Sequence, residues 1–302
     1  MITTRPKLGD MSRERVVLSL LLSCAAAWTS SCRKRDASNV RDSAADTMRP
    51  ASVASSSASD WATELGQMLL VPSDSNKTAV VLYPIDPSAR LIGSQPTTLV
   101  NAAGDTTRVK LVPSDSQECG DAPVVHLAGA VPAAWSVGLL ARSAKLLRMD
   151  SIAGLPSADS ARLAAELTRL ASALATQPGS RFTGLPFAVF GAHRFESDGR
   201  QFLVGHLVRH LNQEAAPGEE RTFVIAERSS SSRAEPFVVA YSERSEGTED
   251  TAEHFETLAA VRGRDSPLLL VARDQLSKTT YEILERRPDG TWRTRWSRTL
   301  AC

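Results

Sequence analysis

The chain has few aromatic residues and no excess of charge of either sign. Aromatic residues make up 5 % of its 302 residues, and 35 basic residues face 34 acidic ones, for a formal charge of +1. Such a balance provides no bulk electrostatic attraction to nucleic acid, so we expect no nucleic-acid partner. The hydrophobic fraction of 42 % is still large enough for a core, which excludes global disorder.

Motifs for nucleotide, metal and cofactor binding are also missing. The sequence contains no glycine-rich phosphate loop, no S-x-x-K motif, no calcium loop and no heptad run. None of its four cysteines forms a C-x-x-C pair or shares a ligand spacing with a histidine, which argues against structural zinc. We therefore expect no metal, no cofactor and no catalytic residue, and we rank a non-catalytic protein above an enzyme.

Long hydrophobic runs are absent as well. The apolar run from Val16 to Trp28 is shorter than the roughly 20 helical residues that cross a bilayer. Arg13 and Arg15 precede this run, and a basic segment before a short apolar one is typical of a secretory signal. Cys32 then follows the small residues Thr29-Ser30-Ser31. Residues 1–32 resemble a bacterial lipoprotein signal peptide.

The resemblance implies that Cys32 is acylated, for example by palmitate, and becomes the new N-terminus. Cys24 is the alternative site of modification, and Ala25-x-Ala27 offers an ordinary cleavage site. The basic run Arg33-Lys34-Arg35 resists translocation, which keeps an uncleaved signal anchor open as a further alternative. In lipoproteins of this kind an Asp after the cysteine favours inner-membrane retention. Arg33 at that position implies an envelope protein sorted to the outer membrane, if the organism has one.

The remaining cysteines, Cys119 and Cys302, are predicted to form one disulfide. Modification of Cys32 removes Cys24 with the leader and leaves a single pair, and disulfides persist outside the cytoplasm. The alternative is two buried free thiols. Residues 33–60 are rich in Ser, Ala and Asp and are predicted to be a disordered tether, because they offer too little apolar surface to offset chain entropy.

Residues 61–302 are predicted to form a single, mostly β domain. Short apolar runs alternate with Gly, Pro and Asp signals, which favours antiparallel hairpins and meanders. One amphipathic helix is expected over residues 157–175, where leucines recur at helical spacing. The segment Leu-Val-Pro-Ser-Asp-Ser occurs at Leu70–Ser75 and again at Leu111–Ser116, so a few-bladed β-propeller is the alternative fold.

Two patterns suggest chemistry only weakly. Ala134-Trp135-Ser136-Val137-Gly138 resembles a loosened nucleophile elbow, and His206 or His254 with Asp265 could complete a triad with Ser136. His206 and His210 are four residues apart, but on the strand expected there they lie about 13 Å apart, too far to share one zinc ion. An envelope serine hydrolase using Ser136 and a histidine is therefore the alternative function.

The last predicted hairpin turns at Pro288-Asp289-Gly290 and supplies the best binding hint. Strand alternation places Trp292 and Trp296 on one face and Arg293 and Arg295 on the other. We name these four residues as a candidate binding face, with buried tryptophans and solvated arginines as the simpler interpretation. The sequence thus favours a non-catalytic, membrane-tethered envelope lipoprotein. Its β domain would bind an envelope protein, a glycan or an anionic lipid.

Overall fold

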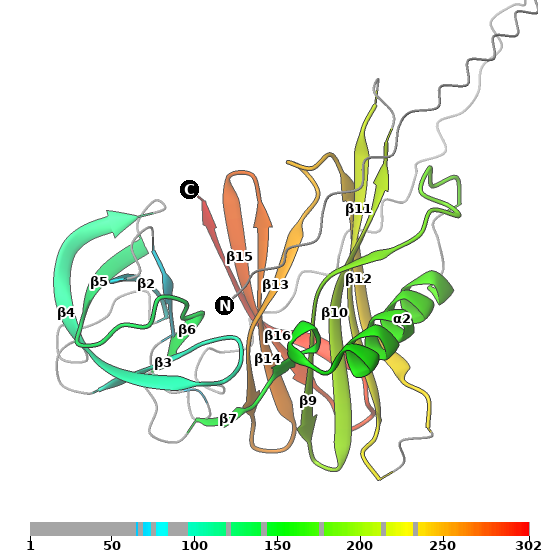
Figure 1. The fold of residues 1–302 in the computed structure, drawn as a ribbon. Coiled ribbons are helices and arrows are strands. Elements are labelled where there is room, and N and C mark those ends of the chain that lie inside the picture. The colour runs from blue at the N-terminus through cyan, green and yellow to red at the C-terminus, as the bar shows by residue number, and fades with distance from the viewer. Residues whose placement is uncertain are drawn as a thin grey trace, which may run out of the picture. The chain divides into compact units, whose positions relative to one another are not determined.

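The computed structural model describes residue 65 and residues 69–73, 77–83, 96–118, 122–139, 144–174, 178–212, 216–231 and 235–301. The described residues form antiparallel β-structure with one α-helix, and all of them belong to one compact unit (Figure 1). The sequence-based fold class, mainly β with one helix, is confirmed. No helix among the described residues has both the length and the apolar character needed to cross a membrane.

The N-terminal strands close into a six-stranded barrel with the order β1-β2-β5-β4-β3-β6. In chain order they are β1 (Leu69–Pro72), β2 (Thr78–Tyr83), β3 (Thr97–Val100), β4 (Thr106–Glu118), β5 (Ala122–Ala128) and β6 (Val137–Leu139). The short strand β6 pairs with both β1 and β3, and this closure leaves no sheet edge. Gly138 permits it, because a Cβ atom there would lie 3.0 Å from the Cβ of Leu70. The repeated Leu-Val-Pro segment places Leu70 and Leu111 in the same barrel core.

Two five-stranded antiparallel sheets follow the barrel. The first sheet has the order β12-β11-β10-β9-β8, with β8 (Asp150–Ser151), β9 (Ala188–Ser197), β10 (Arg200–Leu211), β11 (Gly218–Ser229) and β12 (Val238–Gly247). The second sheet has the order β16-β15-β14-β13-β7, with β7 (Lys145–Leu147), β13 (His254–Arg262), β14 (Pro267–Gln275), β15 (Lys278–Arg286) and β16 (Trp292–Ala301). Four strands of each sheet are consecutive in the chain, so both sheets are built mainly by hairpins.

The inner faces of the two sheets pack against each other. Phe202 and Phe223 of the first sheet share one buried cluster with Phe255, Leu269 and Trp292 of the second. The Phe223 and Phe255 rings stack with their centroids 5.5 Å apart, and the Phe202 ring meets the Trp292 ring edge-on. Burial of these large apolar groups is the main force that joins the two sheets.

Each sheet is covered on its other face by a different element. Helix α2 (Ser157–Ala173) places Leu163, Leu167 and Leu170 on the first sheet, as the leucine spacing predicts (Figure 1). The second sheet packs its outer face on the barrel, in a cluster that includes Leu268 and Leu270 together with barrel residues such as Val71. A 3₁₀ turn, η1 (Ile152–Gly154), connects β8 to the start of the helix segment.

The helix expected over 157–175 is observed as α2, and the Pro288-Asp289-Gly290 turn connects β15 to β16 with Gly290 at φ 90°. The propeller alternative is wrong, because the described strands form one closed barrel and two face-to-face sheets rather than radial blades. The leader, the lipid site Cys32, the tether and both partners of the predicted disulfide, Cys119 and Cys302, lie outside the described residues.

Candidate functional site

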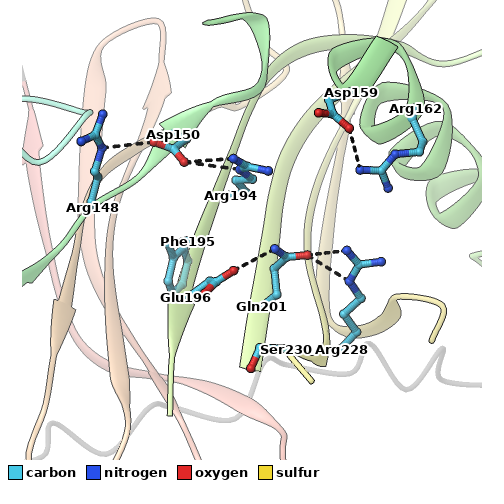
Figure 2. A pocket seen from close by; sticks show the side chains of 10 residues that line it. All are labelled: Arg148, Asp150, Asp159, Arg162, Arg194, Phe195, Glu196, Gln201, Arg228 and Ser230. Atoms are coloured by element: carbon cyan, nitrogen blue, oxygen red, sulfur yellow. Dashed lines mark hydrogen bonds and ion pairs between the residues drawn. The ribbon is translucent and has the colours of Figure 1, made fainter. Parts of the chain in front are cut away.

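Helix α2 covers only part of the outer face of the first sheet. Under the helix this face is apolar, with Leu203 on β10 and Ala226 on β11 in the buried cluster. The same face becomes polar two residues away from Leu203 and Ala226. There the strand pairing aligns Glu196 on β9, Gln201 on β10 and Arg228 on β11 in one row. The uncovered part forms the floor of a recess beside the start of α2 (Figure 2).

The recess has a volume of about 870 Å³, within the range of small-molecule sites. Most of its lining side chains are charged or carry an amide, and they come from α2 and from the strands and connections of the first sheet. The lining residues are Arg148, Asp150, Asp159, Arg162, Arg194, Phe195, Glu196, Gln201, Arg228 and Ser230. We call this feature the arginine recess.

Arg228 is the most buried cation of the arginine recess, with only 8 % of its surface exposed. Its Nε and Nη2 atoms donate to Oε1 of Gln201 at 3.0 and 2.6 Å. The amide nitrogen of Gln201 in turn donates to Oε1 of Glu196 at 3.0 Å (Figure 2). The guanidinium carbon also lies 4.3 Å from the centroid of the Phe237 ring. The Gln201 amide and the Phe237 ring therefore help to hold the guanidinium plane in one orientation.

Arg194 and Arg148 share one carboxylate. Asp150 on β8 pairs with Arg194 on β9 in the sheet, and its Oδ2 lies 3.3 and 3.4 Å from Nη2 and Nε of Arg194. Its Oδ1 accepts from Nε of Arg148 at 3.2 Å, although the Arg148 side chain is 86 % exposed. One carboxylate thus pairs with two guanidinium groups. Its contacts to Arg194 are long for charge-assisted hydrogen bonds.

The helix supplies the remaining wall. Asp159 lies in the first turn of α2, and its Oδ1 accepts from Nη2 of Arg162 at 3.1 Å. Further along the helix, Glu166 has its pKa lowered, mainly by its hydrogen bond to Arg169 and to a smaller extent by the positive charge of Arg228. The positive charge of Arg228 on the recess floor therefore also contributes to the electrostatic environment of Glu166 on the helix.

The arginine recess is suited to bind an anion. Its lining carries four guanidinium groups and three carboxylates, so it is positive on balance. The planar guanidinium fork matches the geometry of carboxylate and phosphate oxygens, and groups that are already held in place lose less entropy when a ligand binds. The described residues contain no group of three or more His, Cys, Asp or Glu side chains that could hold a metal ion.

The residues of the alternative hydrolase lie in different cavities. Ser136, just before β6, lines a recess of about 490 Å³ together with Glu256, Asp274 and Tyr281. His206 and His254 line another cavity, between the two sheets. Among the hydrogen bonds of the described residues, none joins Ser136 to either histidine, although His254 pairs with Asp274 between strands β13 and β14.

Asp265, the predicted acid of the triad, is exposed in the β13–β14 turn. The pKa of Glu256, in the same recess as Ser136, is raised by burial and then by the negative charge of Asp274. The described surroundings of Ser136 therefore contain carboxyl and phenol groups but not the imidazole that would activate a serine.

The predicted face on the last strand is wrong in its geometry. A bulge at Arg295 breaks the alternation of β16, because Ile283 pairs with Trp296 whereas Leu284 pairs with Thr294. Trp292 is therefore buried between the two sheets, while Trp296 packs in the cluster that joins the second sheet to the barrel.

The two arginines of that predicted face both contact one carboxylate. Nη2 of Arg293 lies 2.9 Å from Glu285, and Nη1 of Arg295 lies 3.2 Å from it. The four residues thus do not form a single aromatic and basic surface. The strand expected around His206 and His210 is confirmed as β10, where His206 bonds Thr257 and His210 contacts Glu219.

The sequence analysis missed every residue of the arginine recess. One local signal was available, since Asp198-Gly199 between alternating segments is typical of a two-residue hairpin turn. That turn aligns Glu196 with Gln201, as observed. The approach of α2, which supplies Arg162, has no such local signal. Comparison of the chain with protein-family models, with curated proteins and with solved structures finds no match.

Proposed function

We propose that the protein is an exported, lipid-anchored, non-catalytic binding protein whose arginine recess holds an oxyanion-bearing ligand at the cell envelope. The N-terminal pattern that ends at Cys32 supports export and anchoring, and the Ser/Ala-rich segment over 33–60 supports a spacer between membrane and domain. The observation that carries the binding role is the convergence of four guanidinium groups on one recess.

The ligand class follows from the shape and charge of the arginine recess. Arg228 on β11 and Arg194 on β9 line the same recess on either side of β10, so an anionic ligand that fills the recess would contact both. The carboxylates Glu196 and Asp159 at the sides would accept hydrogen bonds from ligand hydroxyl groups. Acidic glycans and anionic lipid headgroups both combine oxyanion groups with hydroxyl groups. Both kinds of molecule are present at the cell envelope.

Binding is tested by calorimetric titration of the full-length, detergent-solubilised protein with an oligogalacturonate, and by flotation with vesicles that contain phosphatidylglycerol. We expect one of the two anionic probes to bind and a neutral maltooligosaccharide or phosphatidylcholine vesicle not to bind. Arg228→Gln and Arg194→Gln should each weaken binding about 10-fold, the loss of one charge-assisted contact. Arg293→Gln is the matched control, because Arg293 lies on the second sheet beside Glu285. If all three variants bound the probe with the affinity of the wild type, the arginine recess would be rejected as the binding site.

Anchoring is tested separately by fractionation of cells. Cys32→Ser should release the protein from membranes into the soluble envelope fraction, because one residue carries the expected acyl chains. Cys24→Ser is the control and should leave the protein with the membranes. Retention after Cys32→Ser would reject the anchor while leaving the binding role intact.

A further inference from the structure

A second cavity lies between the two sheets, away from the arginine recess. It has a volume of about 200 Å³ and is lined by strands β9 to β11 of the first sheet and by the connection and strand that lead into the second sheet. Its walls include Phe190, His206, Val208, His254 and Phe255. For comparison, an engineered apolar cavity of about 150 Å³ is known to hold benzene. We call this cavity the aromatic slot.

A β-bulge places Phe190 at the slot. Gly191 pairs with His206 and Val189 pairs with Leu207, so Phe190 is an extra, unpaired residue of β9. The residue is 69 % exposed, and its ring meets the His254 ring edge-on with the centroids 4.9 Å apart. Bulges re-aim side chains and recur beside functional sites. An exposed phenylalanine contributes little to folding, and at this position its ring lies where it would pack on a ligand in the slot.

The inner end of the aromatic slot is already arranged around the rings of His206 and Phe255. His206 is buried, and its Nε2 lies 3.2 Å from Oγ1 of Thr257. Burial lowers the pKa of His206 to about 3, so its ring is neutral at physiological pH. The His206 ring meets the rings of Phe223 and Phe255 at steep angles, with centroids 5.1 and 6.2 Å apart. The aromatic ring of a ligand could therefore pack against both the edges and the faces of these rings.

The charges of Glu219 and Arg221, which both line the slot, are already shared among protein groups. Glu219 lies 2.8 Å from Nη2 of Arg221 and 3.0 Å from Nδ1 of His210. Arg221 also donates to the backbone carbonyl of Glu249 at 3.4 Å. A charged ligand group would need to break these contacts or to lie among the buried rings without a partner, and both are costly. The slot therefore favours an uncharged group.

We propose that the aromatic slot is a second binding site and that it takes the uncharged aromatic ring of a small ligand, about the size of phenol. The ring would pack between Phe190 and the Phe255 end of the slot. This proposal does not rest on the arginine recess, whose residues lie on the other face of the first sheet.

The test is ¹⁹F NMR of the full-length chain carrying Cys32→Ser, so that no lipid or detergent competes for the ring. The probe is 4-fluorophenol, with 4-fluorobenzoate and 4-fluorobenzylamine as charged analogues. We expect 4-fluorophenol to bind at least 10-fold more tightly than either charged analogue. Phe190→Ala should weaken it about 10-fold, and Phe190→Tyr should retain it. Val238→Ala is the matched control, because Val238 is an apolar residue of β12 with 63 % exposure.

A filling variant tests the cavity itself. Val208→Trp should abolish binding of 4-fluorophenol, and its thermal unfolding would show whether the domain still folds. If it does not fold, Phe190→Ala alone decides the outcome, since an exposed side chain can be removed at little cost. Three results would overturn the proposal: no binding of 4-fluorophenol, equal binding of the charged analogues, or unchanged binding in Phe190→Ala. Arg228→Gln should have no effect here, which separates this test from that of the arginine recess.

Discussion

The outer face of the first sheet is covered by a helix in one half and open in the other. In the covered half, Leu203 and Ala226 lie against the leucines of α2. In the open half, two residues further along the same strands, Gln201 and Arg228 line the arginine recess. The pairing of β10 with β11 is continuous through both halves, so the difference between them comes from side chains. An apolar face requires a covering element, whereas a polar face stays open to solvent and to ligands.

The start of α2 sets the boundary between the halves. The helix begins at Ser157 after Pro156, and its first buried residue is Leu163. The six helix residues before Leu163 contain no leucine, and two of them, Asp159 and Arg162, line the recess. The same helix thus closes one half of the face and forms a wall of the other.

The largest expected effect is in the covered half. Leu167 is fully buried and occupies the space above Gly205, where a Cβ atom would lie 2.6 Å from its Cδ2. Leu167→Ala should lower the free energy of unfolding by about 3 kcal/mol, because it removes buried methyl groups and leaves a cavity. Urea denaturation followed by circular dichroism measures the loss.

The same pair offers an internal check. Gly205→Ala alone should destabilise the protein, and the combination of Gly205→Ala with Leu167→Ala should cost less than the sum of the two single changes. Strict additivity would show that the helix does not pack on Gly205. Leu276→Ala, at an exposed hairpin tip, is the control and should change stability by less than about 0.5 kcal/mol.

The next effect contrasts the charged outer face with the neutral inner face. His206 has a folded-state pKa of about 3, lowered first by burial and then by the charges of His254 and His193. Since its unfolded pKa is about 6.5, the unfolded state binds more protons below pH 6.5. The contribution of His206 is fully present above pH 6.5 and is lost as the pH falls toward 3. At pH 5 the loss should be about 2 kcal/mol relative to pH 7.

The measurement compares unfolding free energies at pH 7 and pH 5 for the wild type and for His206→Gln, which has no titrating group. The wild type should lose about 2 kcal/mol more than the variant over this interval. A variant with the same pH dependence as the wild type would show that His206 is not buried in the neutral form.

A third change sharpens the account of the open half. Asp150→Asn removes the carboxylate shared by Arg148 and Arg194, so the lining gains one unit of positive charge. The affinity for the anionic probe should rise about 5-fold, since the guanidinium groups no longer compete with a fixed carboxylate. Stability should change by less than about 1 kcal/mol, because the pair is partly exposed. Calorimetry measures the affinity. Weaker binding in Asp150→Asn would contradict the claim that Asp150 competes with the ligand for Arg148 and Arg194.

The smallest effect is expected at the helix wall. Arg162 is half exposed and bonded to Asp159, so Arg162→Gln should weaken anion binding by only about 2-fold. The effect should disappear as the salt concentration is raised, because exposed charges are screened. A loss as large as that of Arg228→Gln would mean that the ligand lies at the rim of the recess rather than on its floor.

Local patterns in the sequence predicted the local structure well. The leucine spacing identified α2, and Pro288-Asp289-Gly290 identified the last hairpin turn, because both depend on a few neighbouring residues. Closure of the barrel was not predicted, since it depends on β6 pairing with β1 and β3 across long stretches of chain. The face of Trp292 and Trp296 was assigned wrongly because a bulge at one residue reverses the alternation beyond it.

The candidate site was less predictable than the fold. Arg228 and Gln201 become neighbours through strand register, and Arg162 joins them only through the placement of α2. Each of these arginines looks like an ordinary surface residue when the sequence is considered alone. The slot residue Phe190 is similar, because its exposure results from a bulge that has no clear signal in the surrounding sequence.

The most direct test of the arginine recess follows its guanidinium groups themselves. Two-dimensional NMR of the arginine Nε–Hε groups, assigned by single substitutions, would be recorded while the anionic probe is added. We predict that the resonances of Arg228 and Arg194 shift together and saturate at one probe concentration, while those of Arg293 and Arg295 stay unchanged. Saturable shifts at Arg293 and Arg295, with none at Arg228 and Arg194, would contradict the account.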